Sequence, residues 1–459
     1  MDLGEAAKEA VRAAREGGAG SADALAVEYR DTTLKVRKGE LETSQESETR
    51  GVGVRAFREG RLGIAYTTDV SPAGLRRAGR QAADLASVAG PDPASGLPDP
   101  SHRAEARCVE GLDDPAFDSF DPVAGREAAR EAEAAAYAAD PRIGNSDGAS
   151  FHATRSAMAL AASDGFEGSC RKTRFSLAVS VAAEEEGGAL QRDGWWTTSC
   201  RLAGLDPAAG VGREAARRTL RRLGWRKVET RQVPVVFSPE VAATSAAKEA
   251  EVAGACCGDG LVRGASFLAD SLGEKVGSDR FTLVDDPFRP GGLGSRPFDA
   301  EGARPLRRAI FEKGVLRCFL FDTWSLRRLA AEAPARAKGG LPGNASRGLG
   351  GRTSVTTSNL YVEPGTAKPE ELLAGVRDGF YVTETMGFGV NVTTGDYSKG
   401  AAGLWIRDGR LDHAVQEVTI AGDLRSMLRD VDGVADDLEF RESTASPTLR
   451  IARMTVSGS

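Results

Sequence analysis

The segment TSAAKEAEVAGACCG, residues 244–258, carries side chains of two types that could perform covalent chemistry. Ser245 and Lys248 are three positions apart, so one turn of a helix would bring the lysine amine to the serine hydroxyl. A serine beside a basic amine is the arrangement of a nucleophile and its general base. Cys256 and Cys257 carry thiols, which are nucleophiles or metal ligands when they are ionised. The alternative is a helix of small residues that packs inside a domain.

Neither motif is specific enough to establish an active site. A Ser-x-x-Lys spacing is expected about once by chance in a chain of this composition, and a second copy runs from Ser169 to Lys172 in a strand-like segment. No Ser-Asp-Asn or Lys-Thr-Gly motif follows at a suitable distance. Adjacent cysteine side chains diverge, and a free cysteine is usually a small buried hydrophobe. We therefore expect Cys256 and Cys257 in a core.

Metal ligands are sparse in this chain. The three histidines, His102, His152 and His413, are far apart, and the sequence contains no His-Glu-x-x-His motif. The six cysteines include no Cys-x-x-Cys pair. Because a zinc site needs three or four ligands within reach of one ion, it could form here only from residues distant in the sequence. We predict that this chain binds no metal and that its cysteines are reduced thiols.

Two glycine-rich loops, residues 339–351 and 387–403, combine small residues with hydroxyl, amide and carboxylate side chains. They include Asn344 in the first loop, and Asn391 and Asp396 in the second. Loops of this kind let a peptide backbone approach closely, and ordered loops of this length are uncommon without a function. The alternative is that both are long hairpin connections.

The flanking sequence predicts the elements that would position these groups. Four helices are expected from their start and stop signals, over residues 5–17, 72–86, a segment after Pro122, and 207–223. The basic cluster at 217–227 is expected to be a solvated helix end, where cations complement the dipole; contact with a phosphate is the alternative. Strands alternate apolar and polar residues between glycine turns, and Lys313-Gly314 and Asp408-Gly409 predict hairpins.

Composition restricts the class of protein. The chain has 459 residues, too many for one ordinary core, and 41% are hydrophobic and 27% charged, as in globular proteins. The formal net charge is -6 with acids and bases intermixed, so we predict no nucleic-acid or membrane partner. No run approaches the roughly 20 apolar residues of a membrane span. The N-terminal helix lacks the apolar core of a secretory signal, and we expect a cytoplasmic protein.

The character of the sequence changes near residue 230. Before this point helices alternate with groups of strands, and after it short strands and glycine turns dominate. We therefore predict an α+β fold with two domains. Residues 1–229 would form an antiparallel sheet with helices, and residues 230–459 a β-rich half.

Longer stretches of the chain resemble a known family. The segment ETSQESETRGVGVRAFREGRLGIAYTTD, residues 42–69, is similar to the N-terminal strand motif of the TldD/PmbA family, once called modulators of DNA gyrase. Three later segments resemble further blocks of the same family, and they begin FLADSLGEKVGSD at 267, GVNVTTGDYSKG at 389 and SPTLRIAR at 446. The resemblance extends over nearly the whole chain, with order and spacing preserved.

The family has two branches that differ in their metal ligands. TldD-type chains are zinc peptidases with a His-Glu-x-x-x-His helix and a cysteine near the C-terminus. In this chain, counting back from residue 267 places the two histidine positions near Glu249 and Gly254, and no cysteine follows Cys318. The chain therefore resembles the PmbA (TldE) branch, and the resemblance implies that it holds no zinc of its own.

The resemblance implies a role beside a catalytic partner. PmbA-type chains pair with TldD-type chains in a metallopeptidase, so we expect a heterodimer with a zinc-carrying TldD-like chain, and a part in proteolysis and peptide maturation. We also expect it to hold an extended peptide through main-chain hydrogen bonds to a strand edge. Arg347 could bind a carboxylate, or it could be an ordinary exposed arginine. The residues expected to support peptide binding are Asn344, Ser346, Arg347, Asn391, Thr394 and Asp396.

Two other functions remain open at this point. The chain could be an independent hydrolase with Ser245 as the nucleophile and Lys248 as the base. It could also be a homodimeric regulator or binding protein without enzymatic activity, for example one that acts on DNA gyrase.

Overall fold

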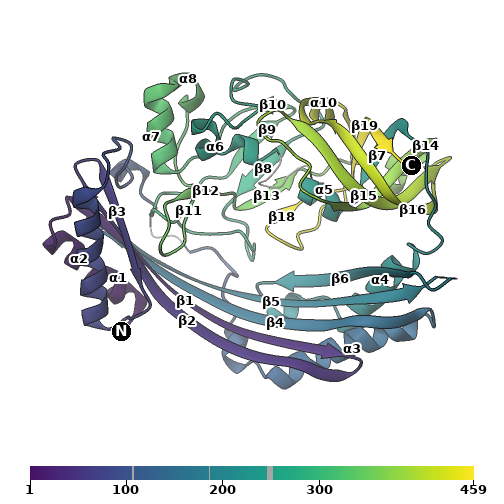
Figure 1. Cartoon of the computed structure of the whole chain (residues 1–459), viewed down its shortest axis with the longest axis horizontal. Helices are drawn as coiled ribbons and strands as arrows, with labels where there is room; N and C mark the ends of the chain where they lie inside the picture. The colour runs from purple at the N-terminus through teal and green to yellow at the C-terminus, as the bar shows by residue number, and fades with distance from the viewer. Residues whose placement is uncertain (106–107, 186, 246–251, 459) are drawn as a thin grey trace.

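The computed structural model describes residues 1–105, 108–185, 187–245 and 252–458. The N-terminal half forms a long curved sheet that passes beneath a β-rich C-terminal half, and helices lie against the far face of the sheet (Figure 1). Helices and strands are mixed in the first half, and strands dominate the second. The α+β fold predicted from the sequence is therefore confirmed.

The first sheet is antiparallel throughout, in the order β3-β2-β1-β4-β5-β6. Its four central strands have 17 to 20 residues each, which makes the sheet roughly 60 Å long. The outer strands are shorter, so parts of β2 and β5 lie at the edge of the sheet. The strands are β1 (Ser21–Arg37), β2 (Glu40–Arg58), β3 (Arg61–Thr67), β4 (Ile143–Ala162), β5 (Glu167–Glu184) and β6 (Leu190–Ser199).

Four helices cover one face of this sheet where the sequence predicts them. α1 (Leu3–Glu16) and α2 (Pro72–Val88) pack on β1–β3 through a core made mostly of alanine and valine, and the Ser71 side chain caps α2 as expected. α3 (Pro122–Ala139) and α4 (Ala208–Leu220) pack on β4–β6. Because alanine and valine side chains are short, the helices approach the sheet closely and leave its other face to the C-terminal half.

The C-terminal half contains two larger sheets around one hydrophobic core. In the six-stranded sheet, ordered β16-β15-β14-β7-β19-β17, β16 also pairs with β19, so the sheet closes back on itself. Its strands are β7 (Arg231–Phe237), β14 (Asp378–Met386), β15 (Asp396–Arg407), β16 (Arg410–Asp423), β17 (Val431–Val434) and β19 (Leu449–Ser457). The five-stranded sheet, ordered β10-β9-β8-β13-β18, comprises β8 (Leu283–Asp286), β9 (Arg308–Glu312), β10 (Val315–Leu316), β13 (Asn359–Val362) and β18 (Thr444–Ala445).

Short elements connect these strands. A two-stranded ribbon pairs β11 (Ala345–Ser346) with β12 (Ser354–Val355). The short α-helices are α5 (Pro239–Ser245), α6 (Gly258–Val262), α7 (Thr323–Glu332), α8 (Pro334–Ala337), α9 (Pro369–Ala374) and α10 (Leu424–Arg429). The 3-10 helices are η1 (Pro100–His102), η2 (Pro115–Ser119), η3 (Leu202–Gly204) and η4 (Gly254–Cys256). Within the described ranges, no helix is both long and apolar enough to cross a membrane.

The two predicted hairpins are confirmed by their backbone angles. Lys313 and Gly314 join β9 to β10 with φ values of 46° and 74°, and Asp408 and Gly409 join β15 to β16 with 48° and 77°. Positive φ at both central residues is the geometry of a type I′ turn, whose twist matches that of the strands it connects.

Candidate functional site

The segment that opens with Thr244 lies only partly within the described residues. α5 ends at Ser245, and the description resumes at residue 252, just before η4 begins at Gly254. Lys248 and Glu249 therefore lie outside the described residues, and the pairing of Ser245 with Lys248 stays a prediction. What the structure does place is the second half of the segment, which is buried.

Cys256 and Cys257 belong to the core of the C-terminal half, as the sequence predicts. Their exposed fractions are 0% and 7%, and the Cys257 thiol donates to the Ala253 carbonyl oxygen at 3.4 Å. Burial raises the pKa of the Cys256 thiol well above its usual value, with a smaller contribution from Cys257. Because thiolates, not thiols, are the reactive species, the buried Cys256 thiol is not prepared for chemistry.

Alkylation should distinguish these thiols from the exposed one. We expect iodoacetamide to modify the exposed Cys108 in the folded protein, whereas Cys256 should react only after unfolding in urea. Mass spectrometry of peptides after timed labelling measures both rates. Modification of Cys256 in the folded protein at the rate of Cys108 would mean that the segment opens to solvent.

The donor set of the described residues does not fit a zinc ion. Gly254, near one of the two positions where the family resemblance implies a histidine, has no side chain to offer. The three histidines are dispersed, with His102 in η1, His152 in β4 and His413 in β16. Among the residues that the structure describes, no three His, Cys, Asp or Glu side chains are placed to share one ion. These residues therefore provide no ligand set with which to activate a water molecule.

The first candidate loop is held in a buried polar network. Asn344 is 2% exposed, and its amide nitrogen donates to Asp285 Oδ2 and to the Thr356 carbonyl oxygen, both at 3.0 Å. Ser346 follows in β11 and is partly exposed. The amide oxygen of Asn344 is buried without a partner among the described residues. The hydrogen bonds of the Asn344 amide nitrogen thus hold the 339–351 loop in place, while its amide oxygen faces the interior.

Arg347 is buried between the two halves of the chain. Its side chain is 2% exposed, and its Nη1 lies 2.6 Å from Oδ1 of Asp23 on β1, so the alternative of an exposed surface arginine is wrong. Asp23 also binds Arg55 of β2, with 2.5 Å between Oδ2 and Nη2, and Arg55 Nη1 lies 2.9 Å from Glu301 Oε1. The carboxylate that Arg347 binds in this structure is therefore one from the chain itself.

The two arginines of this network keep the buried Asp23 carboxylate ionised. Burial disfavours the Asp23 carboxylate, but the adjacent guanidinium groups of Arg347 and Arg55 outweigh burial and lower the pKa of Asp23. Burial also lowers the pKa of the Arg347 guanidinium. Because Glu301 Oε2 accepts a hydrogen bond from the Thr323 amide, the network continues to the start of α7. It therefore clamps the first sheet to several loops of the C-terminal half.

A second buried carboxylate, Asp299, holds the same loops in place. It accepts hydrogen bonds from the amides of Glu301, Ala303 and Ala345, at 2.9, 2.9 and 3.0 Å. Burial, together with the neighbouring Glu301 carboxylate, raises the pKa of Asp299 to about 7. The folded protein therefore retains a proton that the unfolded chain releases at lower pH.

This proton makes the stability depend on pH with a defined sign. The stabilisation from protonated Asp299 is complete below its unfolded pKa, near 3.8, and is lost as the pH rises through about 7. The melting temperature of the wild type relative to Asp299→Asn, which does not titrate, should therefore fall between these limits and stay constant above them. A relative melting temperature that stays constant over this range would mean that Asp299 is already ionised in the folded state.

The second candidate loop forms an exposed turn with its own hydrogen bonds. The Asn391 side-chain oxygen accepts from the Thr393 amide at 3.0 Å, and Thr394 Oγ1 donates to Asp396 Oδ2 at 2.6 Å. Asn391, Thr394 and Asp396 are all exposed. Within the described part of the chain, no hydrogen bond or ion pair links them to Asn344, Ser346 or Arg347. The six predicted residues therefore form two separate groups, one exposed and one largely buried.

The basic cluster at 217–227 begins in the last turn of α4, as predicted, but it is solvated only in part. The side chains of Arg217 and Lys227 are 62% and 56% exposed. The Arg218 side chain is only 8% exposed, and its Nε lies 3.5 Å from Asp193 Oδ1. Arg222 Nη1 lies 2.6 Å from Glu384 Oε2 on β14, in the other half of the chain. The buried part of the cluster contributes to the contact between the halves through Arg222, which periodicity within one helix cannot reveal.

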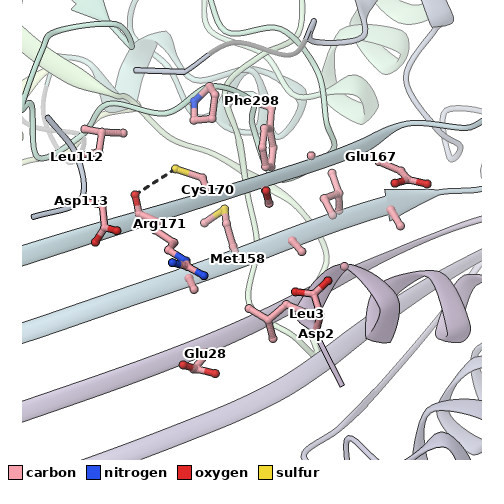
Figure 2. A pocket seen from close by; sticks show the side chains of 18 of the residues that line it. Asp2, Leu3, Glu28, Leu112, Asp113, Met158, Glu167, Cys170, Arg171 and Phe298 are labelled. Carbon is pink, nitrogen blue, oxygen red and sulfur yellow. Dashed lines mark hydrogen bonds between the residues drawn. The ribbon is translucent and has the colours of Figure 1, made fainter. Parts of the chain in front are cut away.

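Motif reasoning missed a cavity of about 1450 Å³ beside β5 (Figure 2). Its lining includes consecutive residues on two facing segments, 167–171 of β5 and 108–113 of the loop between η1 and η2, together with residues 1–4 and Phe298. The sequence signal that could have indicated this cavity is that β6 is shorter than β5. β6 pairs only with residues 175–184 of β5 and leaves the earlier part of β5 uncovered. The Ser169–Lys172 motif lies here, but strand geometry turns the two side chains to opposite faces.

Family models match most of the chain. The first PmbA/TldA metallopeptidase domain matches residues 22–86, the central domain 115–223 and the C-terminal domain 230–458. The C-terminal match begins where β7 enters the six-stranded sheet.

Whole-chain comparisons agree with these matches. Metalloprotease PmbA of Escherichia coli O157:H7 is 35% identical over 460 residues, which cover 98% of this chain and 96% of that protein. A Bacteroides thetaiotaomicron crystal structure, provisionally named as a modulator of DNA gyrase, superposes with a TM-score of 0.89 at 28% identity, covering 99% and 98%. The TldE structure from Thermococcus kodakarensis shares the fold, with a TM-score of 0.84 at 20% identity, covering 98% and 99%. The chain belongs to the PmbA/TldD metallopeptidase family.

Proposed function

We propose that this chain is the non-metal-binding, PmbA-type subunit of a two-chain metallopeptidase, and that it acts in proteolysis and peptide maturation in the cytoplasm. One observation carries the proposal: a chain of a metallopeptidase family has no histidine near positions 249 and 254, where the family resemblance expects the zinc ligands. The absence of three clustered donors from the described residues supports it further. The six cysteines form no disulfide, as is typical of a reducing compartment.

The missing ligands define what the partner must supply. Zinc polarises a peptide carbonyl and lowers the pKa of a bound water, so hydrolysis would require a TldD-like chain with a complete ligand set. This chain would then contribute to holding the substrate in an extended form. The exposed group Asn391, Thr394 and Asp396 is available for a direct contact, whereas Asn344 and Arg347 would act by keeping their loop in place.

Two alternatives make different predictions. A Ser245–Lys248 hydrolase would cleave peptides without a partner, and its activity would disappear in Ser245→Ala. A homodimeric regulator, for example of DNA gyrase, would form a stable complex with itself and would not recruit a TldD-like chain.

Co-purification with metal analysis tests the proposal. The chain is expressed with an affinity tag, alone and together with the TldD-like chain of the same genome, and zinc is measured by mass spectrometry. We expect the co-purified pair to contain about one zinc ion per two chains and the lone chain to contain none in stoichiometric amount. Stoichiometric zinc in the lone chain, or failure of the two chains to co-purify, would contradict the proposal.

A further inference from the structure

The early part of β5 is an open strand edge, and its outward-facing backbone groups can be identified. The Thr173 amide donates a hydrogen bond at 2.8 Å to the carbonyl oxygen of Leu112, in the loop between η1 and η2. The Thr173 amide therefore faces away from β4. Because backbone groups alternate in direction along a strand, those of Ser169 and Arg171 face away from β4 as well. Both residues precede the part of β5 that β6 covers.

These outward groups are left without backbone partners. Among the described residues, no backbone hydrogen bond reaches the amides of Ser169 or Arg171 from the open side. The Arg171 carbonyl oxygen is contacted by the Cys170 thiol at 3.6 Å, and a thiol is only a weak donor (Figure 2). The edge therefore offers a donor and an acceptor at each of two positions, in the spacing that an added strand requires.

The edge faces a slot that is bordered by protein on two sides and open to solvent. The cavity of about 1450 Å³ is bordered by residues 167–171 on one side and by the loop 108–113 on the other, and the loop meets β5 where the Thr173 amide bonds to the Leu112 carbonyl oxygen. Five residues of extended chain span roughly 15 Å, which matches the uncovered part of the strand. The slot thus has the form needed to accept a short extended segment.

The two faces of this edge differ in chemistry. Gly168 and Cys170 lie on the face toward the C-terminal half, where Phe298 and Met158 form an apolar cluster with Cys170. Ser169 and Arg171 alternate onto the other face and are exposed. Arg171 makes no ion pair with any described residue, whereas its neighbour Arg155 is bound to Asp113 and Asp118. A strand added here would meet apolar contacts on one face and the exposed guanidinium of Arg171 on the other, with the Asp118 carboxylate nearby in the cavity lining.

We propose that an extended peptide binds along residues 167–171 of β5 as an additional strand, with small apolar side chains toward Phe298 and an acidic side chain toward Arg171. The inference rests on the proposed function, because it assigns a location to the peptide that this subunit would hold. Main-chain hydrogen bonds provide affinity for many sequences, and alternation of apolar and acidic side chains provides the preference.

Fluorescence anisotropy with the full chain tests the site. The probe is a fluorescein-labelled octapeptide that alternates valine with serine and glutamate, and it is compared with the same peptide N-methylated at alternate residues. We expect N-methylation to weaken binding by about tenfold or more, because it removes the donors that meet the strand edge. Equal affinity of the two peptides, or no binding of the unmodified one, would overturn the proposal.

Two substitutions at one position separate the backbone from the side chain. Ser169→Pro removes the outward amide, which an edge strand tolerates, whereas Ser169→Ala retains it. We expect the proline variant to bind about tenfold more weakly than the alanine variant, with circular dichroism confirming that both fold.

A charge reversal tests the side chain of Arg171. Arg171→Glu should bind a lysine version of the probe more tightly than the glutamate version. Equal affinity of the two Ser169 variants, or an unchanged charge preference in Arg171→Glu, would contradict the site.

The proposed function and this site can fail separately. If a Ser169→Pro chain supports hydrolysis by its TldD-like partner as well as the wild type does, the edge of β5 is not where substrate binds. If the wild-type pair hydrolyses nothing, the proposed function fails, whereas the anisotropy measurement on the lone chain still decides whether this edge binds peptide.

Discussion

Asp23→Ala is expected to lower the free energy of unfolding by about 3–5 kcal/mol, because it leaves two buried arginines without their shared carboxylate. The side chains of Asp23 and Arg347 are 0% and 2% exposed, so water cannot replace the lost partner. Arg55 would keep only Glu301, and Arg347 would keep no carboxylate within ion-pair distance among the described residues. Urea unfolding followed by circular dichroism measures the change.

An exposed ion pair between the same two halves is the matched control. Arg174 of β5 lies 2.8 Å from Glu442, and their side chains are 47% and 42% exposed. Because solvent screens such a pair, Arg174→Ala should cost no more than about 1 kcal/mol. A loss in Asp23→Ala as small as that in Arg174→Ala would mean that the buried network does not hold the halves together.

Gly53→Ala should displace the loop that carries Arg347 from the first sheet. A Cβ atom on Gly53 would lie 2.1 Å from the carbonyl oxygen of Leu349 and 2.7 Å from its Cα. Because the obstacle is backbone rather than a flexible side chain, the loop has to move, at a cost of about 1–3 kcal/mol or more. We expect a lower melting temperature and new cleavage within residues 339–351 in limited proteolysis.

Gly144→Ala provides the control for this substitution. Gly144 is an exposed strand residue with negative φ, and a Cβ there would meet no atom within 4 Å. Alanine should therefore be neutral or slightly stabilising, since it reduces the freedom of the unfolded chain. Resistance of the 339–351 loop to protease in Gly53→Ala, at the wild-type level, would show that the loop does not rest on the sheet at this glycine.

Helix starts and hairpins could be predicted from short stretches of the sequence. Ser71 before Pro72 marks the start of α2, and Lys313-Gly314 marks a hairpin, because each depends on residues adjacent in the chain. The burial of Cys256 and Cys257 followed from the general behaviour of free cysteines. The family resemblance added the zinc positions and the role of a partner, which the spacing of residues in this chain alone does not contain.

Contacts between distant segments could not be predicted in the same way. Arg347 and Asp23 are 324 residues apart, so a single sequence contains no sign that the arginine is buried against that carboxylate. The burial of Arg218 within the basic cluster could not be predicted for the same reason, since Trp195 and Glu240 cover it from other elements. The cavity beside β5 depends on where β6 ends and on how the loop 108–113 crosses it, and both are properties of the assembled sheet.

The most direct test of the central claim is the rate at which an unfolded, reduced and carboxymethylated protein is hydrolysed by each chain and by the pair. The chain described here and the TldD-like chain of the same genome are purified separately, mixed, and assayed with and without a zinc chelator. We predict hydrolysis by the pair, its loss with the chelator, and no hydrolysis by this chain alone. Cleavage by this chain alone, or equal cleavage by the TldD-like chain without it, would contradict its assignment as a non-metal subunit that the peptidase requires.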